Sequence, residues 1–450
     1  MIARHERLAI FVVSLAMSMN IPDLLAADDA KMKHSGRDTS MSWQEKAVSY
    51  ARIMSRVKWT PVAEGMPIKG RGYFEKGTEY TGIPYSSVKS VGRYVGFDIF
   101  LKTFLAAVEN PVSVLYTENL SGKVTNAATY YGKVCSSYTS YALQCGIWYV
   151  SRLYGPPHRD GIKLVDAQSA QAVKVGDVIF TPPATPSGGS HVEIVTGITR
   201  NENGEVTHVR VEDSWPPTTR TINRTASNFT SHISSKGKRL YRITDLYTWR
   251  GDNRAESFLF PNYEEDLNAP VINRVLLLDR GDWVPYHKDQ PVKINVMDRD
   301  ARGVKTLVIK RGGTVVEKIG VQSPGVIERS FSRCGDYTAH GVMNDGSLSQ
   351  ACEFSVCDIE FGELPKQVTV AESWGIEFSA DNMNVIMVYL SSDKNSYARH
   401  CVVVTEQDRR NGRFIVPAGL VQDTGKWQIW LIGENRYGRL TKCRDVTAVE

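Results

Sequence analysis

The sequence has little excess charge of either sign and, after its first thirty residues, no long apolar run. Its 54 Lys and Arg nearly balance its 49 Asp and Glu, which gives a net charge of +5 over 450 residues. No dense cluster of basic residues is present, so the composition gives no argument for a nucleic-acid partner. No later segment approaches the roughly 20 apolar residues that span a bilayer, so we expect no membrane span there.

Motifs for binding metals and phosphates are also absent from the sequence. It has no His-Glu-x-x-His, no paired Cys-x-x-Cys, no calcium-binding loop and no phosphate-binding glycine motif before a helix. We therefore expect neither a metal nor a cofactor. Apolar residues make up 42% and charged residues 23% of the chain, as in globular proteins with packed cores. At roughly 100–200 residues per domain, the length predicts two to four domains.

The N-terminus has the pattern of an export signal. Arg4 and Arg7 precede an apolar run from Leu8 to Met19, which is too short to cross a bilayer, and two alanines follow as small residues for cleavage. This pattern predicts a signal peptide over residues 1–27, and the alternative is an uncleaved membrane anchor. The mature protein is then exported, to the periplasm, the cell wall or the extracellular space.

The order of helix and strand patterns predicts three domains. Helical spacing near the start of the mature chain gives way to strands that are joined by a hairpin turn at residues 201–204. This succession predicts an α+β domain over residues 40–262. From residue 268 onward, short strands recur roughly every 8–12 residues between turns. Two such stretches, 268–358 and 359–450, end in similar hairpins and predict two all-β sandwiches of the immunoglobulin type.

Cys135 follows a loop that contains Gly132 and opens a predicted helix that runs to about Tyr149. The start of a helix carries partial positive charge and free backbone N–H groups. Both favour a thiolate, and the N–H groups can hold an oxyanion. Cys135 is therefore a candidate nucleophile. The alternative is a buried, inert cysteine or a disulfide partner.

His191 begins a predicted strand after a loop rich in Pro, Gly and Ser. At such a strand edge the imidazole is open to substrate and is placed to take the proton of Cys135 and return it to a leaving amine. The alternative is an incidental surface histidine, since His158, His208 and His232 belong to the same predicted domain.

Three fragments occur in a set order: Val134-Cys135-Ser136-Ser137, Gly176-Asp177-Val178-Ile179-Phe180 and His191-Val192-Glu193-Ile194-Val195. This order resembles that of the NlpC-type and CHAP-type cell-wall peptidases. The resemblance covers about residues 40–260. It implies a papain-like fold with Cys135 as nucleophile and His191 as base. It also implies that the substrates are peptidoglycan stem peptides of a bacterial cell wall, and it implies no cofactor.

The same resemblance points to a third catalytic residue. The segment Val211-Glu212-Asp213-Ser214-Trp215 is similar to the Glu-x-Asn-Trp strand of CHAP-type enzymes. That match makes Glu212 the group that orients His191, although Ser214 departs from the pattern. Strand parity leaves Asp213 as a rival, because adjacent side chains of a strand point to opposite faces.

A fourth segment, Gly82-Ile83-Pro84-Tyr85, resembles the Gly-x-Pro-Tyr segment of NlpC-type enzymes, whose tyrosine lines the active site. The match implies that Tyr85 binds substrate. About 50 residues separate Tyr85 from Cys135, which is more than is usual in that family. The alternative is a tyrosine in a turn that packs on the core.

Seven cysteines in an exported chain can form disulfides, and the odd number leaves at least one thiol free. The hairpin that turns near Asp345 places Cys334 almost opposite Cys357, so we expect a cross-strand disulfide there. A second disulfide, between Cys401 and Cys443, would close the last sandwich.

Two classes of function stay open at this stage. The first is an exported cysteine hydrolase that cleaves amide bonds through a Cys-His-Glu site. The second is an exported adhesin or wall-binding scaffold with immunoglobulin-like modules and an inactive hydrolase-like domain. The retention of both a cysteine and a histidine in order favours the enzyme. Nothing in the sandwiches identifies a ligand.

Overall fold

The computed structural model describes most of the chain from residue 41 onward. The described residues are 41–68, 72–85, 89–90, 93–94, 101–117, 134–143, 161–182, 190–235, 237–245, 275–280, 284–392, 399–435 and 437–450. Residues 1–27, predicted as a signal peptide, lie outside them. No helix within these ranges is long and apolar enough to cross a membrane.

Helix α1 (Trp43–Arg56) begins at a capping box. The Ser42 hydroxyl accepts a hydrogen bond from the backbone N–H of Glu45 at 3.3 Å, and the Glu45 carboxylate accepts one from the backbone N–H of Ser42 at 2.7 Å. These bonds satisfy N–H groups that the first turn of a helix leaves without partners. The helix buries Ala51 and Met54, so its apolar stripe faces the interior.

Two further helices follow, α2 (Leu101–Val108) and α4 (Cys135–Leu143). Helix α4 begins at the residue expected from the sequence. Helix α4 was expected to continue over residues 144–149, which lie outside the described residues.

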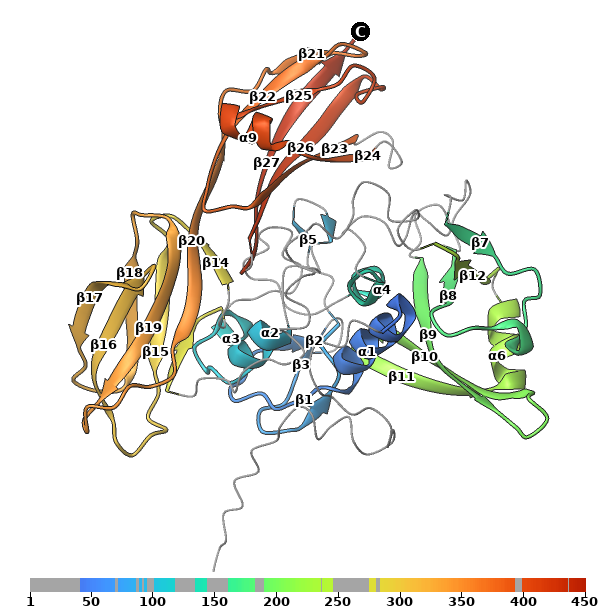
Figure 1. Ribbon diagram of the computed structural model, residues 1–450, viewed down its shortest axis with the longest axis horizontal. Coiled ribbons are helices and arrows are strands. Elements are labelled where there is room, and N and C mark those ends of the chain that lie inside the picture. The colour runs from blue at the N-terminus through green and yellow to red at the C-terminus, as the bar shows by residue number, and fades with distance from the viewer. Residues whose placement is uncertain are drawn as a thin grey trace, which may run out of the picture. The chain divides into compact units, whose positions relative to one another are not determined.

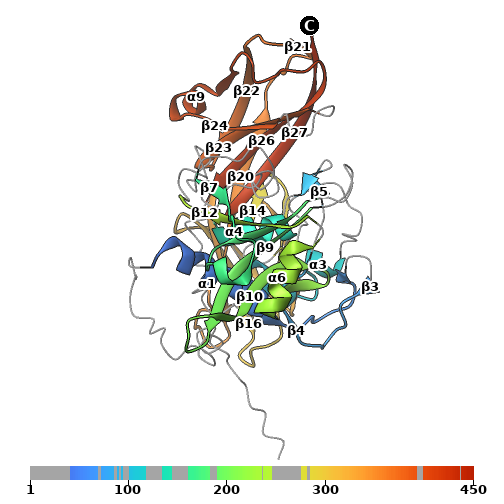
Figure 2. The same ribbon diagram turned by 90° about the vertical axis from the view of Figure 1, so that its right-hand side faces the viewer.

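A six-stranded antiparallel sheet forms the centre of the α+β domain, in the order β11-β10-β9-β8-β12-β7. Its strands are β7 (Ile162–Leu164), β8 (Val178–Thr181), β9 (His191–Arg200), β10 (Val206–Trp215), β11 (Thr218–Thr225) and β12 (Arg239–Ile243). Helices α1 and α4 lie on one face of this sheet (Figure 1). Helix α6 (Ala226–Ser234), which the sequence did not predict, covers the other face and lies in front of the sheet in Figure 2.

Short elements complete the described part of this domain around a small aromatic core. They are β1 (Lys58–Trp59), β2 (Pro67–Ile68), β3 (Gly72–Tyr73), β4 (Tyr80–Thr81), β5 (Lys89–Ser90), β6 (Arg93–Tyr94), α3 (Val114–Thr117) and the 3₁₀ helix η3 (Ala170–Ala172). The Trp59 ring packs edge-on against Phe74 and Phe104, with centroids 4.9 and 5.3 Å apart. These rings bury the apolar side of α2.

The first sandwich is built from two sheets. One has the order β13-β15-β18, and the other contains β17-β16-β19-β20, with β14 parallel to β20. The bounds are β13 (Leu276–Leu278), β14 (Val284–His287), β15 (Pro291–Val296), β16 (Val304–Arg311), β17 (Thr314–Gly320), β18 (Gly325–Ser330), β19 (Gly335–Met343) and β20 (Cys352–Phe361). Side chains that alternate along β19, such as Tyr337 and Ala339, fill the core between the sheets.

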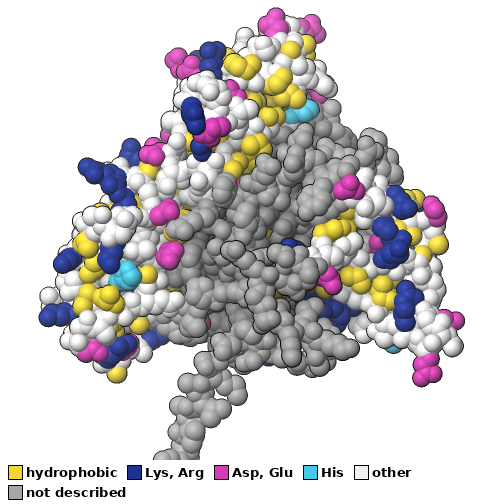
Figure 3. All heavy atoms as spheres, in the orientation of Figure 1, with side chains coloured by type: hydrophobic (Ala, Val, Ile, Leu, Met, Phe, Trp, Pro, Cys, Tyr) yellow, Lys and Arg dark blue, Asp and Glu magenta, His cyan; other side chains and the backbone are white. Residues whose placement is uncertain are grey.

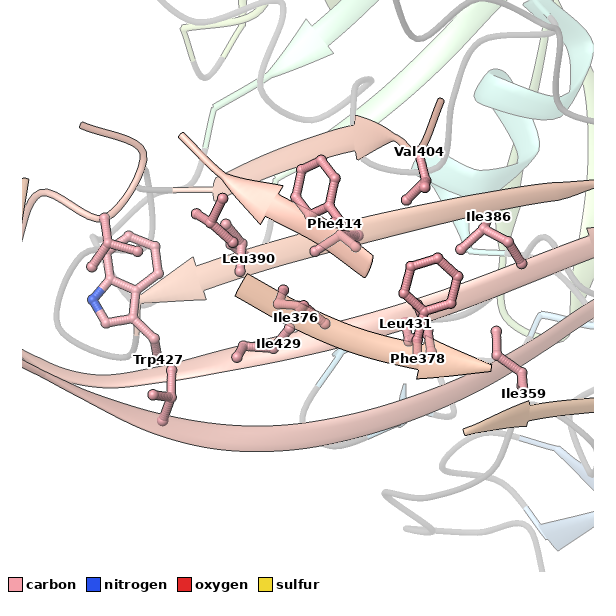
Figure 4. Close-up of a cluster of buried hydrophobic side chains, with 14 of the residues drawn as sticks. Ile359, Ile376, Phe378, Ile386, Leu390, Val404, Phe414, Trp427, Ile429 and Leu431 are labelled. Atoms are coloured by element: carbon pink, nitrogen blue, oxygen red, sulfur yellow. The ribbon is translucent and has the colours of Figure 1, made fainter. Parts of the chain in front are cut away.

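The second sandwich repeats this plan. Its sheets are β21-β27-β26-β23-β24 and β20-β22-β25. The bounds are β21 (Gln367–Thr369), β22 (Trp374–Asp381), β23 (Val385–Ser392), β24 (Arg399–Val403), α9 (Glu406–Asn411), β25 (Arg413–Val416), β26 (Gly425–Asn435) and β27 (Gly438–Val449). Figure 4 shows its core, in which Trp427, Ile429 and Leu431 of β26 meet Ile376 and Phe378 of β22.

A shared feature supports the prediction of internal repeats. In each sandwich an early strand pairs in parallel with the last strand: β14 with β20, and β21 with β27. Strand β20 pairs with β19 through residues 352–356 and with β22 through residues 358–361, so one strand belongs to both sandwiches. The boundary expected between residues 358 and 359 falls inside this strand.

Neither disulfide expected from the sequence is present among the described residues. Cys334 does lie across from Cys357, because Gly335 pairs with Val356 in the β19–β20 register. Both residues are nevertheless free thiols. The Cys357 thiol is buried instead, with its sulfur 3.1 Å from the Ser355 hydroxyl.

The second expected disulfide is contradicted by the order of the strands. Cys401 lies on β24 and Cys443 on β27, with β23 and β26 between these two strands. At about 4.8 Å per strand, their Cα atoms are roughly 14 Å apart, whereas a disulfide needs less than about 7 Å. The prediction failed because it treated the two strands as neighbours.

The described chain is therefore mainly β structure, with two immunoglobulin-like sandwiches after an α+β domain. On the face drawn in Figure 3, Lys and Arg side chains are interspersed with Asp and Glu. This mixture, seen among the described residues of that face, agrees with the small net charge.

Candidate active site

Hydroxyl groups hold helix α4 and so fix Cys135 at its start. The buried Tyr138 hydroxyl donates to the carbonyl oxygen of Ala51 in α1 at 2.6 Å. The Thr139 hydroxyl donates to the carbonyl oxygen of Cys135 at 3.0 Å. Cys135 is the first residue of the helix, where backbone N–H groups and the positive end of the dipole are concentrated. Backbone N–H groups in this position can hold an oxyanion.

His191 is the first residue of β9, and the structure brings it to Cys135. The Cys135 thiol donates to the carbonyl oxygen of Ser190, the residue before His191, at 3.9 Å. The Cys135 sulfur also lies close enough to the imidazole to raise the pKa of His191. The two residues that the sequence singled out thus lie together.

The environment of His191 favours its charged form. Burial by itself lowers the pKa of His191, but hydrogen bonds with Asp213 and Cys135, together with the charges of both, outweigh burial and raise that pKa to about 10. An imidazolium next to a thiolate is the resting arrangement that a cysteine hydrolase needs. The charge state of His191 therefore fits a Cys–His pair.

The imidazole is held on its other side by Asp213. The Nε2 atom of His191 lies 2.8 Å from Oδ2 of Asp213, whose side chain is fully buried. Arg220 of β11 binds the same carboxylate, with Nε 2.8 Å from Oδ1 and Nη2 3.2 Å from Oδ2. Burial opposes ionisation of Asp213, but its hydrogen bonds with His191 and Arg220 lower its pKa below the usual value. Since Nε2 is used by Asp213, the Nδ1 atom is left for Cys135.

The structure does not bring Glu212 to His191, which corrects the assignment made from the sequence. The Glu212 carboxylate is fully buried and accepts hydrogen bonds from the hydroxyls of Ser55 at 2.6 Å and Thr196 at 3.1 Å, and the Tyr138 hydroxyl lies 3.1 Å from it. Burial raises its pKa. Glu212 therefore joins α1, α4 and β9 from the opposite face of β10, and Asp213 occupies the position beside the histidine.

Tyr85 lies close to the turn between β10 and β11. Its backbone N–H donates to the carbonyl oxygen of Pro217 at 2.8 Å. Gly82, three residues earlier, has φ +85° and passes so close to β11 that an added Cβ would lie 2.1 Å from the carbonyl oxygen of Thr219. The Gly-x-Pro-Tyr segment thus needs its glycine for a close backbone approach. It places the backbone of Tyr85 beside Pro217, two residues after Trp215.

Trp215 forms an exposed edge of the site. Its ring packs edge-on against the His191 imidazole, with centroids 5.2 Å apart and an interplanar angle of 86°. The side chain is 48% exposed, although it is large and apolar. A half-exposed tryptophan beside the His191 imidazole is a surface on which a ligand can pack.

The Gly-Asp strand that helped to identify the resemblance has a structural role here. Gly176 has φ +86°, and its backbone N–H donates to the carbonyl oxygen of Val195 on β9 at 2.9 Å. Asp177 accepts two hydrogen bonds from Arg242 of β12, at 2.9 and 2.7 Å. These hydrogen bonds join Gly176 to Val195 and Asp177 to Arg242, and none of them reaches His191. The segment fixes β8 between β9 and β12.

One group of side chains has the composition of a metal site. Ligand atoms of His191, Glu193 and Asp213 lie within 4.8 Å of one another. Arg220 pairs with Asp213, and Arg224 lies 3.3 Å from Glu193. Each carboxylate is already balanced by an arginine, so the group has no surplus negative charge with which to attract a cation.

No protein-family model matches the chain, and no curated protein sequence is significantly similar to it. Several solved structures are similar to about a third of the chain, at low identity and low TM-score. The fibronectin(III)-like modules of Clostridium thermocellum CbhA cover 37% of this chain and 87% of their own, with 13% identity and a TM-score of 0.18. An I-band fragment of titin has 16% identity, a TM-score of 0.21, and coverage of 37% and 62%. An amphioxus IgVJ-C2 molecule has 13% identity, a TM-score of 0.18, and coverage of 36% and 99%. We therefore base the immunoglobulin-like assignment on the strand pairing described above.

Arg220 belongs to this site but was not predicted from the sequence. The sequence does contain a pattern that indicates its position. Pro216 and Pro217 form a tight turn between two strands, with a cis peptide bond between them. A hairpin centred on these prolines places Arg220 across from Asp213, as the observed register shows. Cross-strand neighbours of opposite charge are expected to pair.

Proposed function

We propose that the protein is an exported cysteine hydrolase of papain-like, NlpC/CHAP type that cleaves amide bonds. In this proposal Cys135 is the nucleophile, His191 the acid and base, and Asp213 the residue that orients the imidazole. One observation carries the proposal: the His191 imidazole is bound through Nε2 to a buried carboxylate and lies beside a thiol at a helix start. This arrangement has the roles of a nucleophile–base–orienter triad, with Asp213 in place of the Glu212 expected from the sequence.

The first half of the reaction forms an acyl-enzyme. The Cys135 thiolate attacks the amide carbonyl carbon, a C–S bond forms, and the carbonyl electron pair moves onto oxygen. Backbone N–H groups at the start of α4 are the donors nearest to the thiol for this oxyanion. His191 then gives its Nδ1 proton to the amide nitrogen. The C–N bond breaks and an amine leaves, so the acyl group remains on sulfur as a thioester.

The second half releases the acyl group. A water molecule attacks the thioester carbonyl while the neutral His191 takes one of its protons. The C–S bond breaks and the product leaves as a carboxylic acid. The proton on His191 and the negative charge on Cys135 restore the initial ion pair. Asp213 keeps its position and its charge through both halves, because it serves the imidazolium through Nε2.

The substrate class that we propose is peptidoglycan stem peptide, and the location is the periplasm or cell wall. The ordered Cys, Gly-Asp and His fragments support this substrate, because they resemble those of cell-wall peptidases. The apolar N-terminal run supports export. The half-exposed Trp215 and the adjacent Tyr85 segment support a peptide-binding groove beside the histidine. We propose no cofactor, and we propose that the two sandwiches hold the catalytic domain close to wall polymer.

The test is digestion of purified muropeptides by the full chain, followed by mass spectrometry of the products. We expect wild type to release fragments with a new amine and a new carboxylate, and Cys135→Ser and His191→Ala to release none. Cys334→Ser is the matched control, because it removes a thiol in the first sandwich and should retain full cleavage. Retained cleavage in Cys135→Ser would refute the proposal.

The same experiment addresses the scaffold hypothesis. If folded wild type cleaves no muropeptide but sediments with insoluble peptidoglycan, the protein acts as a wall-binding scaffold and the hydrolase proposal is rejected. If it cleaves a peptide outside the wall and not muropeptides, the mechanism stands and the substrate class is rejected.

A further inference from the structure

Arg220 closes a ring of four side chains around the candidate active site. His191 binds Asp213 through Nε2 at 2.8 Å, and Asp213 accepts two hydrogen bonds from Arg220, at 2.8 and 3.2 Å. The Arg220 guanidinium carbon lies 5.6 Å from the centroid of the Trp215 ring. The Trp215 ring in turn packs edge-on against His191. Each member contacts two others, so the orientation of each limits that of the next.

Charge gives Arg220 a second role. A working Cys–His pair consists of a thiolate and an imidazolium, which together carry no net charge. Asp213 adds one negative charge at a position that is fully buried. An uncompensated charge in such a place is costly, and the group would take up a proton instead. Arg220 supplies the fourth charge, and the set of four groups is then neutral.

Charged and titratable groups lie on each of the elements packed against β10, which carries Asp213. They are His191 and Glu193 on β9, Arg220 and Arg224 on β11, Cys135 and Tyr138 on α4, and His232 on α6. Glu193 is already engaged by His232 at 2.6 Å and by Arg224 at 3.3 Å. Of the cationic groups in this set, only Arg220 and His191 bind Asp213 directly.

We propose that Arg220 is a positioning residue, which keeps Asp213 ionised and aimed at His191 and thereby sets the charge state of the Cys135–His191 pair. This inference rests on the function proposed above. Arg220 acts through Asp213 and does not touch the reacting atoms. Its half-exposed side chain, at 45%, offers a different possibility, which is that it binds a substrate carboxylate. The test below separates these two roles.

The readout is the rate at which iodoacetamide alkylates Cys135 as a function of pH, followed by peptide mapping. This measurement reports the thiolate–imidazolium pair and needs no substrate. The variants are Arg220→Met, which keeps side-chain volume without charge, and Arg220→Lys, which keeps charge without a two-pronged hydrogen bond. The matched controls are Arg242→Met and Arg242→Lys. Arg242 forms the same kind of paired contact with buried Asp177 in the same domain.

Without Arg220 the thiolate loses a nearby positive charge, and Asp213 is less fully ionised and less well aimed at the imidazolium. We therefore expect the alkylation profile of Arg220→Met to narrow, with its acid limb at higher pH and its alkaline limb at lower pH, each by about one unit. Arg220→Lys should move them by less than half as much. On the cleaved substrate, Arg220→Met should lower kcat by roughly 10- to 100-fold and change KM by less than about threefold. Both Arg242 variants should lower Tm and leave the profile in place.

A profile of Arg220→Met that superimposes on that of wild type overturns the inference. So does an equal shift in Arg242→Met, because the effect would then be one of general stability. A rise in KM with unchanged kcat shows that Arg220 binds substrate, and the positioning role is rejected. If Arg220→Met does not fold, the test rests on Arg220→Lys. An alkylation profile and a kcat equal to those of wild type in Arg220→Lys would show that the two-pronged contact with Asp213 is not needed. Failure of the proposed hydrolase would appear separately, as cleavage that survives in Cys135→Ser.

Discussion

The Nε2 atom of His191 lies 2.8 Å from Oδ2 of Asp213, whereas the carboxylate of Glu212, one residue earlier, is held by three hydroxyl groups on the opposite face of β10. Successive side chains of a strand point to opposite faces, so only one of two adjacent acids can serve the histidine. The register of β9 and β10 determines which one does. In that register Glu212 pairs with Ile194, so Glu212 and His191 belong to opposite faces.

Asp213→Asn should lower turnover far more than it changes substrate affinity. An amide keeps the size of the side chain but removes the charge that fixes the imidazole and stabilises its protonated form, and losses of this kind reach roughly 10⁴-fold. Steady-state kinetics on one cleaved muropeptide give kcat and KM for the variant. A kcat within about threefold of wild type would show that His191 takes its orientation from another group.

Glu212→Gln is the matched control for Asp213→Asn, since it makes the same chemical change at the adjacent residue. We expect it to keep kcat within about threefold, because its carboxylate meets Ser55, Tyr138 and Thr196 rather than His191. A loss as severe as that of Asp213→Asn would mean that the original assignment, made from the resemblance, was right.

Tyr138→Phe should reduce stability with little effect on chemistry. The hydroxyl donates to Ala51 at 2.6 Å and meets Glu212 at 3.1 Å, so it ties α4 to α1 and to β10 in a fully buried place. Losing it leaves buried acceptors with fewer partners, which costs about 1–3 kcal/mol in the free energy of unfolding. Urea denaturation of the variant and of wild type measures this difference. An unchanged midpoint would show that the bond contributes nothing.

Much of the fold could be read from the sequence where local patterns decide it. The capping box at Ser42, the helix start at Cys135 and the strand at His191 are set by residues within a few positions of each other. The strands of both sandwiches follow from alternation and turns. Helix α6 was missed, because only Phe229 and Ile233 are apolar and buried along it.

The candidate site was harder to predict where it depends on register. Two register shifts occur along the β9–β10 ladder, near Val206 and near Arg210. A single shift changes which residues of β9 and β10 share a face of the sheet beyond that point. A second shift restores the pairing that simple alternation would give. Sequence alone does not locate bulges, so Glu212 and Asp213 could not be separated by counting. The prediction of a disulfide between Cys401 and Cys443 was wrong for a related reason, because it depends on the order of strands in the sheet.

Cys334 and Cys357 should be recovered as thiols that react more slowly than Cys135. Burial is the main cause that raises the pKa of each, to about 12, so little thiolate forms at neutral pH. Timed alkylation of the native chain without reductant, followed by peptide mapping, gives the rate at each cysteine. Recovery of a Cys334–Cys357 disulfide from freshly purified protein would contradict the free thiols found here.

Truncation of Trp427 tests the core of the second sandwich. This residue is fully buried among apolar side chains of facing strands (Figure 4), and its indole N–H donates to the carbonyl oxygen of Asp423 at 2.8 Å. Trp427→Ala should destabilise the sandwich by roughly 3–5 kcal/mol, because a large cavity replaces the ring. Tryptophan fluorescence and circular dichroism during denaturation should show an earlier transition. A destabilisation below about 1 kcal/mol would place the ring outside the core.

The pH profile tests the charge state of the Cys135–His191 pair. The folded pKa of His191 is raised to about 10, from an unfolded value near 6.5, so its contribution to stability is fully present below about 6.5 and is lost as pH rises through about 10. The contribution of Asp213 to stability depends on pH in the opposite way, because its pKa is lowered in the folded state. That contribution is present above about pH 3.9 and is lost as pH falls through the folded-state pKa of Asp213. We therefore expect both kcat/KM and Tm to decline on the alkaline side only as pH approaches 10.

Asp213→Asn provides the internal check on that profile. Removing the carboxylate takes away the largest of the interactions that raise the pKa of His191, while the burial that lowers it stays. The alkaline limb of kcat/KM should then move to lower pH, and further than the shift in the same direction that we expect for Arg220→Met. Activity can be followed between about pH 5 and pH 11 on the same muropeptide. An alkaline limb near pH 7 in wild type would mean that His191 is neutral at rest, and a general-base mechanism acting on a protonated thiol would replace the ion pair.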